Sequence, residues 1–148
     1  RLFCALIRIQ PPADRPIGVA HCDAHYGHQS GQINYWLPLM SVNTVNTLWV
    51  ESAPGVKDFH PLLLNYGECS RFYGNQCVHY TMANDSDITR VSLDFRVVPG
   101  PVFEPDPEIS RNTNGSQQYS LRSGGFGDSD GGYYREYRVD ANGAFKTA

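Results

Sequence analysis

Hydrophobic and polar residues alternate along several short stretches of the chain, and no stretch keeps the helical period of about 3.6 residues. The alternation is clearest over residues 32–39 and 88–98. Because successive side chains of a strand point to opposite faces, this pattern predicts β-strands. Residues 2–10 are almost continuously apolar, which predicts a buried strand. Further strands are predicted at 47–52, 60–66, 70–73 and 77–82.

Turn-forming dipeptides such as Pro11-Pro12 and Pro54-Gly55 separate these stretches. Short strands with a turn every ~8–12 residues are typical of a β-sandwich or a jelly roll. We therefore expect an all-β jelly roll in which two sheets face each other and a ligand sits in the mouth between them. Residues 24–31 show no periodicity and are predicted to form a loop over that mouth.

The composition of the chain changes after Pro99. Residues 1–98 are expected to form the jelly-roll catalytic core, since 148 residues suffice for one domain with a hydrophobic core. Residues 99–148 are rich in glycine, proline, serine and asparagine. This composition predicts a C-terminal extension that packs on the core or is partly mobile.

Charge and cysteine usage narrow the class of partner. The net charge of -3, from 12 basic and 15 acidic residues, predicts neither nucleic acid nor an anionic membrane as a partner. No apolar run is long enough for a transmembrane helix.

The four cysteines form no CxxC pair, so we expect reduced thiols in a cytoplasmic protein, with a Cys69–Cys77 disulfide as the alternative.

Three side chains suggest a metal centre. His21 and Asp23 are two residues apart, so both lie on one face of an extended segment. A second histidine, His79, precedes a turn and could arrive from a distant strand, because a jelly roll places such strands side by side. Two imidazoles and one carboxylate are the ligands of the facial triad that holds Fe(II) and leaves open positions.

Arg90 and Ser92 follow His79 on the next predicted strand and share a face. A guanidinium fork and a hydroxyl can bind a carboxylate, such as that of 2-oxoglutarate. An ordinary amphipathic strand has the same pattern, with Arg90, Ser92, Asp94 and Arg96 in solvent. Both interpretations stay open from the pattern alone.

Loop histidines offer a different metal site. His21, His25 and His28 have the spacing H-x3-H-x2-H and could bind zinc, with Asp23 as a fourth ligand. A cupin-like zinc or iron enzyme that uses no 2-oxoglutarate therefore stays open. So does a non-catalytic jelly-roll binding module with a vestigial or different metal site. The position of Arg90 distinguishes these alternatives from an oxygenase.

Taken together, four segments resemble a known family: His21-Cys22-Asp23, INYWLPL at 33–39, NTLWVESAPG at 46–55, and His79 followed by RVSLDFRV at 90–97. They resemble the phytanoyl-CoA-dioxygenase-like branch of the Fe(II)/2-oxoglutarate-dependent oxygenases, and within it the streptomycin-biosynthesis-type oxygenase proteins of bacteria. The resemblance covers roughly residues 2–98. The order HxD, then H, then RxS is fairly specific, although no single piece is.

The resemblance implies a double-stranded β-helix that hydroxylates a small metabolite with O2, yielding succinate and CO2 from 2-oxoglutarate. Halogenating members have a small residue where Asp23 stands, so hydroxylation is favoured, with desaturation or ring closure left open. The helices that usually precede the β core are not apparent, so we expect a fragment or a minimal version. The implied iron ligands are His21, Asp23 and His79, and the implied 2-oxoglutarate contacts are Arg90, Ser92, Asn34 and Trp36.

Overall fold

The computed structural model describes residues 2–3, 5–103, 134–135, 137–139 and 145–147, and these residues are mostly strands and loops. A six-stranded antiparallel sheet has the order β6-β3-β8-β1-β9, and β2 also pairs with β8. Its strands are β1 (Leu2–Phe3), β2 (Leu6–Gln10), β3 (Ile33–Pro38), β6 (Ser70–Phe72), β8 (Arg90–Val97) and β9 (Tyr134–Arg135).

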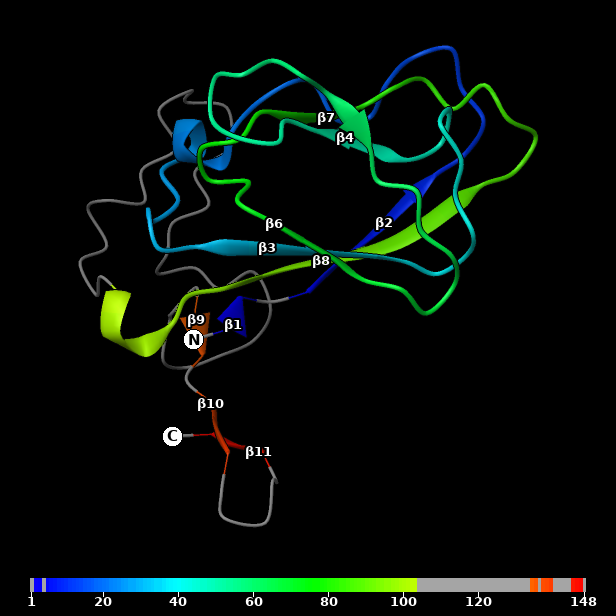
Figure 1. The fold of residues 1–148 in the computed structure, drawn as a ribbon. Coiled ribbons are helices and arrows are strands. Elements are labelled where there is room, and N and C mark those ends of the chain that lie inside the picture. Colours follow the sequence, from blue (N-terminus) through cyan, green and yellow to red (C-terminus); the bar gives the residue numbers. More distant parts are fainter. Residues whose placement is uncertain (1, 4, 104–133, 136, 140–144, 148) are drawn as a thin grey trace.

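A smaller sheet of order β5-β4-β7 forms the second layer. In Figure 1, β4 and β7 (top) lie across from β3, β8 and β2 (centre). The strands of this sheet are β4 (Leu48–Val50), β5 (His60–Pro61) and β7 (His79–Thr81). The other described elements are the short 3-10 helices η1 (Asp23–Tyr26) and η2 (Gly100–Val102), and a hairpin of β10 (Tyr137–Val139) and β11 (Phe145–Thr147).

Two facing antiparallel sheets confirm the predicted all-β double-stranded β-helix. The thiols of Cys22, Cys69 and Cys77 are free, so the alternative Cys69–Cys77 disulfide is not formed. Cys4 and residues 104–133 lie outside the described part of the chain. Neither of the helices seen in the described residues has the length and apolar character needed to cross a membrane.

The central strand is β8, which pairs with β3 along one edge and with β2 along the other. Its register places Asn34 opposite Arg96 and Gln10 opposite Arg90. Directly opposed residues point to the same face of a sheet. Polar side chains from all three strands therefore gather on the inner face, toward the smaller sheet.

Three sequence predictions need correction. The strand at 2–10 is not buried: Ile7 is 67% and Ile9 62% exposed, because they lie on the outer face of the sheet. The strand predicted at 60–66 is only His60–Pro61. The loop predicted at 24–31 begins within η1, where a backbone hydrogen bond from His25 to Cys22 starts a helical turn.

Candidate metal centre

Backbone hydrogen bonds bring His21 and His79 together. The N–H of His21 donates to the carbonyl of His79 (3.1 Å), and the N–H of His79 donates to the carbonyl of His21 (2.9 Å). This isolated antiparallel bridge attaches the segment before η1 to strand β7. Since opposed residues share a face, the two imidazole rings lie side by side, with centroids 4.5 Å apart.

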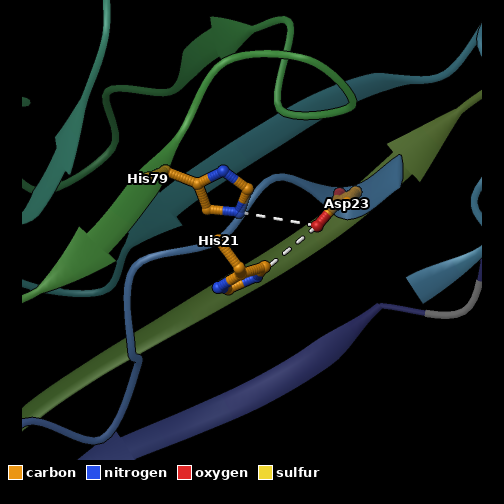
Figure 2. Close-up of side chains that lie close together, drawn as sticks. All are labelled: His21, Asp23 and His79. Carbon is orange, nitrogen blue, oxygen red and sulfur yellow. Dashed lines mark ion pairs between the residues drawn. The ribbon is translucent and has the colours of Figure 1, made fainter. Parts of the chain in front are cut away.

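Asp23, the first residue of η1, completes the group. Its N–H donates to the carbonyl of Gly74 (2.8 Å), and the residue is only 1% exposed. Its Oδ1 atom lies 3.6 Å from Nε2 of His21 and 3.5 Å from Nε2 of His79 (Figure 2). The ligand atoms of His21, Asp23 and His79 all lie within 4.8 Å of one another, so these three residues could hold a metal ion. In the described part of the chain no other such group is found.

Both imidazoles are oriented by backbone carbonyls. Nδ1 of His21 lies 2.7 Å from the carbonyl of Val19, and Nδ1 of His79 lies 3.1 Å from the carbonyl of Cys77. A carbonyl can only accept, so each Nδ1 carries a proton, and Nε2, which faces Asp23, is the nitrogen that can offer its lone pair to a metal. Metal-binding histidines in proteins are held in the same way. Two lone pairs and a carboxylate oxygen converging on one point fit a divalent cation.

The other oxygen of Asp23 is already occupied. Oδ2 accepts hydrogen bonds from Nδ2 of Asn34 (2.7 Å), Nε of Arg96 (2.9 Å) and Nε2 of Gln32 (3.0 Å). Burial alone would raise the pKa of Asp23, but contacts with the two histidines and the charge of Arg96 hold it well below its usual range. Asp23 is therefore ionised and can act as a ligand at neutral pH.

Arg90 lies in the interior, which excludes the interpretation that places it in solvent. The residue is 1% exposed and lines the same cavity as His21, His79 and Trp36. Its guanidinium carbon lies 5.7 Å from the centroid of the Trp36 ring, and Nη1 donates to the carbonyl of Asn46 (3.2 Å). Burial, and then the charge of Arg8, lower the pKa of Arg90 to about 10, so it stays protonated at neutral pH.

Five buried side-chain atoms of the described residues have no hydrogen-bond partner, and two of them can donate: Nε of Arg90 and Oγ of Ser92. The other three are the acceptors Oε1 of Gln10, Oδ1 of Asn34 and Oδ1 of Asp94. Ser92 is fully buried. It is the next residue of β8 after Arg90 that points to the inner face, but it does not line the cavity. Unpaired buried donors are costly, so a bound acceptor such as a carboxylate fits this place.

The alternative zinc set of His21, His25 and His28 is not assembled in the structure. His25 is exposed, and His28 hydrogen-bonds to the side chain of Gln32. Burial, and then the charge of Arg96, lower the pKa of His28 to about 4.

Sequence reasoning missed two residues of the site, Gln32 and Arg96. The only signal in the sequence was that each shares a strand face with a candidate: Gln32 with Asn34, and Arg96 with Arg90. Asn34 and Trp36 do line the cavity, but the amide of Asn34 holds Asp23.

The comparisons with known proteins agree with this architecture. No protein-family model matches the chain. Over 94 residues it is 37% identical to the streptomycin biosynthesis protein StrG of Streptomyces griseus, a match that covers 64% of this chain and 44% of StrG. The assignment to the phytanoyl-CoA-dioxygenase-like branch stays a prediction.

The solved structures that share the fold include two non-haem enzymes. The nickel complex of the non-haem monooxygenase ThoJ has a TM-score of 0.55 at 18% identity, over 67% of this chain and 44% of that one. The non-haem α-ketoglutarate-dependent epimerase SnoN from nogalamycin biosynthesis has a TM-score of 0.55 at 21% identity, over 66% of this chain and 47% of SnoN. The chain thus spans less than half the length of StrG and of both these proteins.

Proposed function

We propose that the chain carries the iron and 2-oxoglutarate site of an Fe(II)-dependent oxygenase that hydroxylates a small metabolite. The observation that carries the proposal is the position of Arg90, a buried cation in the cavity shared with His21 and His79. In the described residues its guanidinium donates to one carbonyl, that of Asn46, and Nε is unpaired. Burial lowers the pKa of Arg90 and the charge of Asp94 acts to raise it, but no hydrogen bond between the two side chains is formed.

The proposed roles follow from the geometry. His21, Asp23 and His79 would hold iron through Nε2, Oδ1 and Nε2, since these atoms converge. Arg90 and Ser92 would bind the distal carboxylate of 2-oxoglutarate, with the Trp36 ring beside the guanidinium. When both groups are bound, the chemistry available is activation of O2 coupled to conversion of 2-oxoglutarate to succinate and CO2.

The small-molecule substrate and the hydroxylation are supported by the similar proteins and by Asp23. StrG, ThoJ and SnoN are named as a biosynthesis protein, a monooxygenase and an epimerase, which supports a small-molecule substrate. Asp23 supports hydroxylation over halogenation, because a carboxylate occupies the third ligand position.

Anaerobic titration with Fe(II) and 2-oxoglutarate tests the proposal. The iron chelate of 2-oxoglutarate gives a weak visible charge-transfer band, which we expect in the wild type. Arg90→Ala should need roughly 10–100 times more 2-oxoglutarate, since a hydrogen bond to a charged group contributes ~1.5–3 kcal/mol. Arg71→Ala, which removes an exposed arginine of β6, should behave as the wild type.

Circular dichroism of each variant shows whether the fold is retained. A folded wild-type protein without the band would contradict the proposal. The chain would then be a jelly-roll binding module, or an enzyme that uses a different metal and no 2-oxoglutarate.

A further inference from the structure

The two oxygens of Asp23 have different surroundings. Oδ1 faces the two imidazoles, with a long contact of 3.4 Å to Nη2 of Arg96. Oδ2 accepts three shorter hydrogen bonds, two from amides and one from a guanidinium. A carboxylate oxygen has only two in-plane lone pairs, so Oδ2 has no capacity left for a metal.

Packing keeps these three donors in place. Arg96, Gln32 and Asn34 are 7%, 0% and 5% exposed, and the β3–β8 register sets Asn34 opposite Arg96. Gly74 packs against the amide of Asn34, since a Cβ added to Gly74 would stand 2.6 Å from Nδ2 of Asn34. The amide of Asn34 therefore has no free space on the side of Gly74.

We infer that Arg96, assisted by Gln32 and Asn34, is a positioning residue that restricts Asp23 to binding metal through one oxygen. This inference rests on the metal site of the proposed function. A carboxylate that bound through both oxygens would take a fourth position of a six-coordinate ion. One-oxygen binding leaves three positions, which a two-oxygen chelator and O2 together require.

Two effects of Arg96 on a bound cation oppose each other. Its positive charge repels the ion, which would weaken binding. Its hydrogen bonds aim Oδ1 between the imidazoles, which strengthens binding. The metal would be screened from the guanidinium by the carboxylate between them, whereas Asp23 contacts the guanidinium directly. We therefore expect the orienting effect to outweigh the repulsion.

Co(II) binding without 2-oxoglutarate tests the inference, because its visible spectrum reports coordination number. Arg96→Gln should raise the Kd for Co(II) about 10–100-fold, as loss of groups that orient metal ligands generally does. Its spectrum should differ from that of the wild type. Arg96→Lys, which keeps the charge and one donor, should fall between the two. Arg71→Gln, on the exposed side of β6, is the matched control and should not change either quantity.

Unchanged or tighter Co(II) binding by folded Arg96→Gln, with the wild-type spectrum, would overturn the inference. If Arg96→Gln does not fold, Gln32→Met removes one neutral donor and should raise the Kd in the same direction. An unchanged Kd in folded Gln32→Met would then overturn the inference.

The failure of the proposed function can be distinguished from the failure of this inference. A wild type whose Co(II) affinity depends on Arg96, but whose iron form gives no 2-oxoglutarate band, would refute the oxygenase and support the positioning role. A wild type that binds no Co(II) would overturn both.

Discussion

The two faces of the β3–β8 pair differ in a way that reverses the usual arrangement of a protein core. The inner face is polar and buried, while the outer face is apolar and only partly covered by the described residues. The inner positions are Gln32, Asn34, Trp36, Arg90, Ser92, Asp94 and Arg96; the outer positions are Ile33, Tyr35, Leu37, Val91, Leu93, Phe95 and Val97.

This difference indicates that the inner face is the one that binds a ligand. Burying charged and amide groups is unfavourable unless each has a partner. On the inner face Asp23 accepts hydrogen bonds from Arg96, Gln32 and Asn34. Arg90, Ser92, Asn34 and Asp94 each keep one unpaired atom. A buried polar face with unpaired atoms lowers the stability of the sheet, and a bound ligand can supply the missing partners. We therefore interpret the inner face as a binding surface.

Removing Asp23 should have the largest effect on the inner face. Asp23→Ala leaves Arg96 buried without its carboxylate, and breaking such a pair costs about 3–5 kcal/mol of unfolding free energy. Urea denaturation of the metal-free protein measures this cost. Adding Arg96→Met should recover part of it, because the stranded charge is then gone.

A second Asp–Arg pair on β8 provides the control. Asp94 binds Arg8 at 2.7 Å, but the side chain of Arg8 is 43% exposed. Asp94→Ala should therefore cost only ~0–1 kcal/mol. Equal costs for the two aspartates would contradict the distinction drawn between the buried pair and the exposed one.

Gly74→Ala should have an intermediate effect, transmitted through Asn34. The added Cβ would stand 2.7 Å from Cγ of Asn34 and 2.8 Å from Cε2 of Phe72, so one of them must move. Overpacking of this kind costs about 1–3 kcal/mol. We also expect weaker Co(II) binding, because a displaced Asn34 releases Asp23.

Gly100→Ala is the matched control for that substitution, since no atom lies within 4 Å of a Cβ added there. Its urea midpoint and Co(II) affinity should equal those of the wild type. Wild-type Co(II) binding by Gly74→Ala would show that Asn34 does not support the metal ligand.

The outer face should give the smallest effect. Ile9→Thr changes a side chain that is 62% exposed, so the free energy of unfolding should change by no more than about 0.5 kcal/mol. Its neighbour Gln10 is fully buried and donates to the carbonyl of Met82. Gln10→Ala should cost ~1–3 kcal/mol, because that carbonyl loses its partner.

A cost for Ile9→Thr as large as that of Gln10→Ala would refute the comparison. It would mean that the outer face is covered in solution.

Periodicity located most of the strands and separated the two faces of β3 and β8, but it did not say which face is inside. For β8 both interpretations were open, and only the 1% exposure of Arg90 decides between them. The prediction that the strand at 2–10 is buried was wrong for the same reason, because an apolar pattern does not say whether a face is covered. A run of Leu and Ile predicts burial only if another layer covers it, and the described residues supply none over Ile7 and Ile9.

The candidate ligands could be proposed from the sequence because HxD is a local pattern. Gln32 and Arg96 could not, because their contact with Asp23 depends on strand register. A shift of one residue would turn each to the other face. The contact of Asn34 with Asp23 could not be predicted either, because it brings together a residue of β3 and a residue of η1.

The central claim is that His21, Asp23 and His79 bind one metal ion, and proton NMR of the Co(II) form tests it most directly. Each ligand imidazole should give one strongly shifted, exchangeable Nδ1–H resonance, because these protons are held by the carbonyls of Val19 and Cys77. Two such resonances are predicted.

His21→Gln and His79→Gln should each remove one of the two resonances, and His25→Gln should remove neither. No shifted resonance in the wild type, or loss of one in His25→Gln, would contradict the claim.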